Sequence, residues 1–140
     1  MIYLLDTDTF NHFHRGRAQV LDRTRSVGQQ NLAITIITRV EVLQGRFEFL
    51  RKAANASELK TAQQRLDESD RALMQWRVIR LDSAACSEFE RLRAQKALRK
   101  IGRADLLIAS IVRANGATLV TRNVRDFQQI QGLRLENWAD

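Results

Sequence analysis

The chain has 140 residues and a formal net charge of +7, with 23 Lys and Arg against 16 Asp and Glu. Its length fits one domain spanning residues 1–140, and its 44% apolar content can supply a hydrophobic core. No apolar run approaches the ~20 residues of a membrane span, no basic segment typical of a signal peptide precedes Asp6, and the single cysteine cannot form an internal disulfide. These features argue against membrane and secreted classes and indicate a cytoplasmic protein, while the arginine-rich charge favours a polyanionic partner such as nucleic acid.

Short apolar runs along the chain are predicted to form five buried β-strands. They cover residues 2–5, 32–36, 78–81, 118–121 and 133–135. Residues 40–54, 57–76, 83–100 and 103–114 have the composition and spacing of helices, the third capped by Ser83 and the last ended by Asn115 and Gly116. Because strands and helices alternate, we predict an α/β fold with a parallel sheet and helices on both faces.

Acidic side chains follow several of these predicted strands. Asp6 and Asp8 come after the first strand, Glu41 opens the helix after the second, Asp105 lies in the first turn of the apolar helix, and Asn123 and Asp126 come after the fourth strand. Ligands of such sheets bind at the carboxyl ends of the strands, so we expect these acids to converge. A carboxylate cluster without His or Cys would repel itself unless neutralised by a hard cation, Mg²⁺ or Mn²⁺.

Each acid also has a purely structural interpretation. Asp6 and Asp8 could cap a short helix, and Thr38 with Glu41 matches a capping box. Asp105 could complement a helix dipole, and residues 123–126 could form a turn before a helix. The functional argument therefore rests on the convergence of four segments at one sheet edge and on no single residue.

The order and spacing of these segments resemble the successive motifs of PIN-domain ribonucleases, and in particular the VapC-type toxins of bacterial toxin–antitoxin pairs. The matching segments are residues 4–8, 38–45, 103–109 and 121–127, and residues 132–138 also resemble the end of these proteins. The resemblance implies a three-layer fold with a five-stranded parallel sheet, Mg²⁺-dependent endonucleolytic cleavage of RNA, and silencing by a cognate VapB-type antitoxin. It also implies that Asp6 and Asp105 bind the metal and that Glu41 is the glutamate of the site.

The fourth motif departs from the commonest PIN pattern, which has Asp where Asn123 stands. Asp126 would then supply the last catalytic carboxylate, or Asn123 would act as a ligand through its amide oxygen or a water. A site of this kind would activate water for phosphodiester hydrolysis, which needs no 2′-hydroxyl nucleophile and leaves a 5′-phosphate.

Basic residues lead directly to Asp105, and we predict that they contact RNA, a solvated helix face being the alternative. They are Lys96, Arg99, Lys100 and Arg103, of which Arg99 and Arg103 share a face if the preceding helix continues. Arg39 and Arg122 either hold the phosphate or pair with a neighbouring site acid. The remaining candidates are interpreted as structural: His12 and His14 as surface or packing residues, Cys86 as a small buried residue, and Trp76 and Trp138 as packing groups.

The helices predicted over residues 40–54 and 57–76 leave an apolar edge, which, together with the resemblance, predicts a homodimer that also binds an antitoxin. The predicted RNA target is a structured RNA such as a tRNA. Two other hypotheses survive: a non-catalytic RNA- or partner-binding domain on the same fold, and a phosphoacceptor signalling domain. The intact acid set argues against the first, and the absence of a lysine after the late strands argues against the second.

Overall fold

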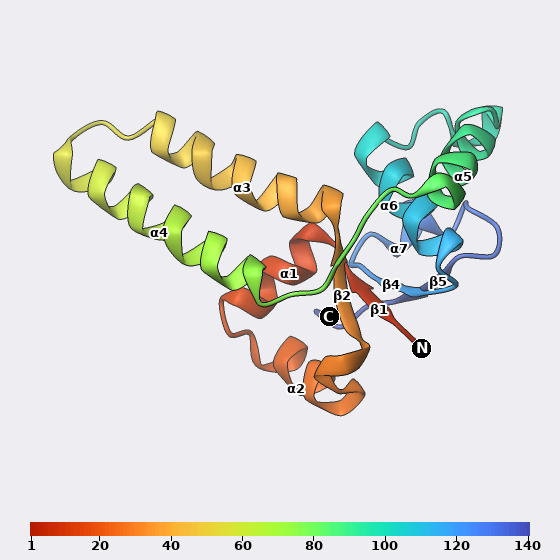
Figure 1. The fold of residues 1–140 in the computed structure, drawn as a ribbon, viewed down its shortest axis with the longest axis horizontal. Helices are drawn as coiled ribbons and strands as arrows, with labels where there is room; N and C mark the ends of the chain where they lie inside the picture. Colours follow the sequence, from red (N-terminus) through yellow and green to blue (C-terminus); the bar gives the residue numbers. More distant parts are fainter.

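The computed structural model describes every residue from Met1 to Asp140. One sheet of five parallel strands lies at the centre, in the order β3-β2-β1-β4-β5, and helices cover both of its faces (Figure 1). The strands are β1 (Tyr3–Leu5), β2 (Leu32–Thr35), β3 (Val78–Ile79), β4 (Thr118–Val120) and β5 (Arg134–Glu136). The predicted α/β fold with a five-stranded parallel sheet is confirmed.

Seven α-helices and two short 3₁₀ turns connect the strands. The α-helices are α1 (Thr7–His14), α2 (Ala18–Val27), α3 (Ile36–Arg51), α4 (Ala56–Met74), α5 (Ser83–Arg93), α6 (Arg103–Ala114) and α7 (Val124–Phe127). The 3₁₀ turns are η1 (Gln29–Asn31) and η2 (Lys96–Leu98). None of the helices is long and apolar enough to span a membrane.

The sheet separates two hydrophobic cores, as the alternation of side chains along each strand requires. Leu4 belongs to a core with residues of α5, α6 and α7, whereas its neighbour Leu5 belongs to a core with residues of α1, α2, α3 and α4. Trp138 is buried in the second core and Trp76 packs against it, with its ring edge-on to Phe10 at 5.4 Å. The two tryptophans are packing groups, as predicted.

The structure corrects the bounds and caps of two predicted helices. Helix α3 begins at Ile36 and not at Val40, because the Thr35 side chain caps it by accepting a hydrogen bond from the Thr38 amide at 3.1 Å. Helix α5 is capped by Asp82 and not by Ser83, and it ends at Arg93 and not near Lys100.

The spacing of two buried leucines explains why α5 ends earlier than predicted. Leu92 and Leu98 are both buried in the same core, yet residues six apart point to different sides of an α-helix. The chain therefore leaves the helix and forms η2, so that both side chains can be buried. Cys86, predicted to be buried, lies instead on the exposed side of α5.

Two pairs of helices extend on opposite sides of the central strands. In Figure 1, α3 and α4 form a long antiparallel hairpin on the left, and α5 and α6 pack together on the right. Helix α1 follows β1, α3 follows β2, and α6 precedes β4. The N-terminal ends of these three helices therefore lie near the carboxyl ends of the three strands. This arrangement positions the candidate site.

Candidate carboxylate site

Asp6 connects the end of β1 to the start of α1. It is the N-cap of α1, and its Oδ1 accepts a hydrogen bond from the Thr9 amide at 2.9 Å. Burial raises the pKa of Asp6 above its ordinary value; hydrogen bonds from Thr121 and Thr9 oppose this shift, and the charge of Asp8 adds to it. Asp6 therefore does cap a helix, but it is also a carboxylate whose charge is costly where it stands.

Asp105 lies in the first turn of α6, as predicted, and faces three other carboxylates. Burial raises its pKa, and the charges of Glu41, Asp6 and Asp126 raise it further. These residues come from α3, the β1–α1 junction and α7, so four segments distant in sequence meet at one sheet edge. The predicted convergence of Asp6, Glu41, Asp105 and Asp126 is what the structure shows.

Glu41 does not close a capping box with Thr38, because Thr38 lies inside α3 and the cap is Thr35. The Glu41 carboxylate instead contacts α1, because the Thr7 hydroxyl donates a hydrogen bond to Glu41 Oε1 at 2.5 Å. The same Thr7 hydroxyl lies 3.3 Å from the hydroxyl of buried Thr38. The Glu41 side chain therefore connects α3 to α1 and does not cap its own helix.

Asp126 and Asn123 are joined to each other at the fourth motif. The Asn123 amide group donates to Asp126 Oδ2 at 3.0 Å, and the Asn123 backbone N–H donates to the Thr121 hydroxyl at 2.9 Å. Both residues are exposed, and they form the expected turn before a short helix. Asn123 uses its amide to orient Asp126, while the charge of Asp126 acts on Asp105.

The donor set suits a hard divalent cation held in an open site. Nowhere in the chain do three His, Cys, Asp or Glu side chains converge tightly enough for a closed metal centre made of protein ligands alone. Mg²⁺ is commonly bound by one or two carboxylates and retains several waters. Asp6 and Asp105, whose pKa values are raised by burial and by neighbouring acids, fit that description.

Comparison with known proteins shows the family to which the chain belongs. The family model of the PIN domain matches residues 3–133, a span that contains all four acids. The chain belongs to the PIN domain family. "Ribonuclease VapC2" of Rickettsia felis is 33% identical over 144 residues, covering 99% of this chain and 98% of the relative, which places the chain with the VapC proteins. "tRNA(fMet)-specific endonuclease VapC" of Shigella flexneri is 25% identical, with 98% of each chain covered.

Solved structures of VapBC proteins match the fold of this chain over nearly its whole length. The chain superposes on a structure of VapBC2 from Rickettsia felis bound to a promoter DNA fragment with a TM-score of 0.78 and 28% identity, covering 99% of each chain. For DNA-bound VapBC from Salmonella typhimurium the TM-score is 0.82 at 23% identity, with 99% of this chain and 98% of that chain covered. The second likeness concerns the fold alone, and it agrees with the family assignment.

The basic residues predicted to contact RNA lie where this PIN domain passes from α5 to α6. Lys96, Arg99 and Lys100 are exposed on η2 and the turn after it and form no ion pair, and exposed Arg103 lies over the Phe89 ring at 4.9 Å. The expectation that Arg99 and Arg103 share a helix face was wrong, because the helix does not continue through residues 99–102. The four residues nevertheless remain on the segment that leads into Asp105.

Asp8 pairs with basic side chains and is not among the acids whose charges act on Asp105. It lies 3.8 Å from Arg122 and 3.5 Å from His12, and Arg122 also pairs with the Asp140 side chain at 3.2 Å. His14 stacks on Phe10 with ring centroids 6.1 Å apart. The histidines are therefore surface and packing groups, as predicted, and Arg122 pairs with neighbouring acids.

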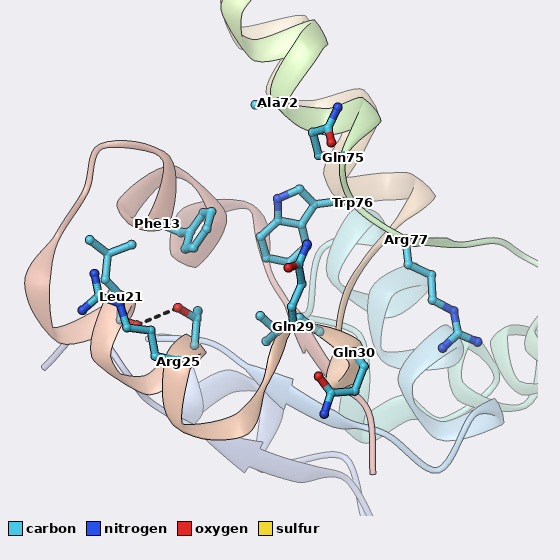
Figure 2. Close-up of a pocket in the computed structure, with 11 residues that line it drawn as sticks. Phe13, Leu21, Arg25, Gln29, Gln30, Ala72, Gln75, Trp76 and Arg77 are labelled. Atoms are coloured by element: carbon cyan, nitrogen blue, oxygen red, sulfur yellow. Dashed lines mark hydrogen bonds between the residues drawn. The ribbon is translucent and has the colours of Figure 1, made fainter.

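The PIN domain also has a cavity of about 660 Å³ that lies apart from the carboxylates. Figure 2 shows it between α1, α2, η1 and the end of α4, with Phe13, Leu21 and Trp76 contributing apolar surface. None of its lining residues is one of the four acids. Charge and hydrogen bonding, and not cavity size, mark the candidate site.

Sequence reasoning missed two hydroxyl groups that position the acids. The Thr7 hydroxyl donates a hydrogen bond to Glu41. The hydroxyl of buried Thr121 forms a hydrogen bond with Asp6 and accepts one from the backbone N–H of Asn123. The available signal was adjacency, since Thr7 directly follows Asp6 and Thr121 ends β4 next to the fourth motif. β-branched threonine is also an ordinary residue at strand ends, so the signal was weak.

Proposed function

We propose that this protein is a Mg²⁺-dependent endoribonuclease and the toxin of a two-component toxin–antitoxin pair that acts in the cytoplasm. The observation that carries the proposal is the meeting of Asp6, Glu41, Asp105 and Asp126 at one sheet edge, where burial and the charges of the other three acids raise the pKa of Asp105. The names of the relatives, a ribonuclease and a tRNA-specific endonuclease, support this reaction class. The proposed substrate is a structured RNA such as a tRNA.

In this proposal Asp6 and Asp105 would hold the ion, with Mn²⁺ as a substitute. A bound divalent ion would lower the pKa of a coordinated water and stabilise charge on the scissile phosphate. Glu41, held by Thr7, would accept a proton or hydrogen bond from the attacking water, and Asp126, oriented by Asn123, would orient a further water of the ion. Cleavage by water would leave a 5′-phosphate.

Lys96, Arg99, Lys100 and Arg103 are proposed to bind the RNA backbone on the α6 side of the acids. The first three form no ion pair within the chain and are exposed, so their charges are available to phosphates. Arg99 and Arg103 each carry a guanidinium group, which can bind phosphate through two hydrogen bonds.

A VapB-type antitoxin is the proposed protein partner, and a homodimer is the proposed assembly. The α3–α4 hairpin exposes large apolar side chains that a partner would cover, namely Val40, Phe47, Phe49, Leu59 and Met74. The solved relatives include VapBC complexes, in agreement with such a partner. Growth arrest on expression alone, relieved by the small protein encoded next to it, is the expected result; harmless expression would contradict the toxin assignment.

The decisive experiment is incubation of purified protein with total RNA in Mg²⁺, in EDTA, and after Asp6→Asn. Cleavage should occur only for the wild type in Mg²⁺. The matched control is Asp82→Asn, because Asp82 caps α5 through the same 2.9 Å bond that Asp6 makes to α1 but lies outside the site. Asparagine is as good an N-cap as aspartate, so neither variant should lose its helix. Cleavage that persists in EDTA or in Asp6→Asn would overturn the proposal.

A further inference from the structure

Three arginines from three different helices lie together on the α3–α4 side of the molecule without an acidic partner. Arg15 is the residue that ends α1, Arg46 lies in α3 and Arg65 lies in α4; we refer to them as the arginine trio. None of the three takes part in an ion pair within the chain. Arg15 and Arg65 are exposed, and Arg46 is half-buried.

Two contacts across the hairpin fix the positions of Arg46 and Arg65. Arg46 Nε donates to the hydroxyl of fully buried Ser69 at 2.8 Å, and the Arg65 guanidinium lies 5.0 Å from the centre of the Phe49 ring. Phe49 lies one turn beyond Arg46 on α3, and Arg65 lies one turn before Ser69 on α4. The two guanidinium groups are thus held on adjacent turns of the hairpin, about 5 Å apart along its axis.

The three positive charges of the trio repel one another, which favours binding of an anion. Burial lowers the pKa of Arg46, and the charges of Arg15 and Arg65 lower it further. A half-buried guanidinium that faces two like charges gains stability when an anion binds between them. Arginine is suited to phosphate, which it contacts through two parallel hydrogen bonds.

The position of the trio relative to the acids favours RNA over a compact anion. In Figure 1 the α3–α4 hairpin, which carries Arg46 and Arg65, lies to the left of the central strands, and α5 and α6, with the basic segment between them, lie to the right. The acids come from both halves, since Glu41 lies in α3 and Asp105 lies in the first turn of α6. A polyanionic strand that crosses the acid site would have phosphates on both sides. Binding of such a strand is favoured by unpaired positive charges on both sides of the acids, where its phosphates would lie.

We propose that the arginine trio is a phosphate-binding subsite for the RNA substrate, on the hairpin side of the scissile bond. This inference rests on the proposed function. Helix rise places Arg46 about 7.5 Å beyond Glu41 along α3 and Arg15 about 13.5 Å beyond Asp6 along α1. With one phosphate per about 3.4 Å of axis on a stacked strand, the trio lies about two to four nucleotides from the site.

The test is the salt dependence of RNA binding in EDTA, where binding does not depend on cleavage. The probe is a fluorescein-labelled oligouridylate, and its Kd is measured by anisotropy at increasing KCl for the wild type and for Arg15→Gln/Arg65→Gln. Each phosphate that a protein neutralises on a single strand adds about 0.7 to the slope of log K against log salt, so the slope of the double variant should be smaller by about 1.4. Arg46 is left in place because its bond to Ser69 supports the hairpin.

The matched control is Arg51→Gln/Arg91→Gln, which removes the same charge at exposed positions already paired with Glu48 and Glu88. An equal decrease of slope in both double variants, or no decrease in the first, would overturn the subsite. Polyglutamate is the competing probe: loss of its binding in Arg15→Gln/Arg65→Gln with unchanged RNA binding would assign the trio to an acidic protein partner instead. Wild-type protein that binds with the full slope but cleaves no RNA in Mg²⁺ would refute the proposed function and leave the subsite standing.

Discussion

Thr7 and Glu41 are joined across the gap between α1 and α3 by a hydrogen bond of 2.5 Å between the threonine hydroxyl and the glutamate Oε1. Thr7 follows Asp6 directly, so the residue that positions Glu41 is attached to the residue proposed to bind the metal. The two halves of the proposed site are therefore coupled through one hydroxyl group, and any movement of α1 relative to α3 would change the direction of the Glu41 carboxylate.

We expect Thr7→Val to lower the RNA cleavage rate by about 10–100-fold, the usual effect of losing a group that orients a metal-site residue. The fold should lose only about 0.5–1.5 kcal/mol, the net contribution of one hydrogen bond. Thr7→Ser keeps the hydroxyl and should restore most of the rate. Single-turnover rates and thermal melts of both variants provide the check, and a Thr7→Ser enzyme as slow as Thr7→Val would contradict the assignment of the effect to the hydroxyl alone.

Asp105→Asn should stabilise the metal-free protein at neutral pH. The raised pKa of Asp105 means that the folded chain binds this proton more tightly than the unfolded chain, so the wild type loses stability as pH rises from the unfolded value of 3.8 through the folded value. The melting temperature of the variant minus that of the wild type should thus be near zero at about pH 3 and positive at about pH 7. Each kcal/mol recovered corresponds to about 2–4 °C.

The same melts in Mg²⁺ should reverse the order. A bound cation stabilises the wild type by mass action, whereas Asp105→Asn has one of the two proposed ligands removed. A variant that is less stable than the wild type in EDTA at neutral pH would contradict the raised pKa. Equal stabilisation of both proteins by Mg²⁺ would remove Asp105 from the ligand set.

The sheet could be predicted because its strands are short apolar runs, and each of the five runs overlaps a strand. Helices α1 and α2 were not predicted from the sequence, and the composition of α1 explains this. Residues 7–14 are Thr, Asp, Phe, Asn and His, all weak helix formers, and the helix forms because Asp6 caps it and Phe10 is fully buried. The cap is local and could be suggested from the sequence, but the burial of Phe10 depends on tertiary structure. The run Ile34–Thr38 likewise has strand composition, but Thr35 ends the strand and caps α3.

In the site, too, some residues could be predicted from the local sequence pattern, whereas their contacts depend on the folded structure. Asp6 and Asp105 could be predicted because Asp6 directly follows a buried strand and Asp105 lies in the first turn of an apolar helix, where an unpaired charge is unfavourable. The partners of Glu41 could not be, since Thr38 and Glu41 have the spacing of a capping box and only the position of α1 brings Thr7 to Glu41. The arginine trio joins residues 15, 46 and 65, which no local pattern relates.

Asp82→Ala should lower stability without changing the chemistry. The Asp82 side chain accepts a hydrogen bond from the Ala85 amide at 2.9 Å as the N-cap of α5, and removing such a cap costs about 0.5–2 kcal/mol. Asp82 lies outside the carboxylate cluster, so the cleavage rate measured well below the melting temperature should equal that of the wild type. A large fall in rate would show that α5 controls the basic segment that follows it.

The last prediction concerns the fourth motif, where Asn123 donates to Asp126 at 3.0 Å. Asp126→Asn removes a carboxylate whose charge acts on Asp105, so it should raise the Mg²⁺ concentration for half-maximal cleavage and slow the reaction by about 10–100-fold. Asn123→Asp replaces the donor by a second acceptor and places two mutually repelling carboxylates side by side, so it should weaken cleavage at low Mg²⁺. Magnesium titrations of both variants, with melts to separate folding from activity, test this assignment. Tighter Mg²⁺ binding by Asn123→Asp, together with an unaffected Asp126→Asn, would transfer the fourth position to Asn123; negligible effects of both would show that Asp6, Glu41 and Asp105 suffice.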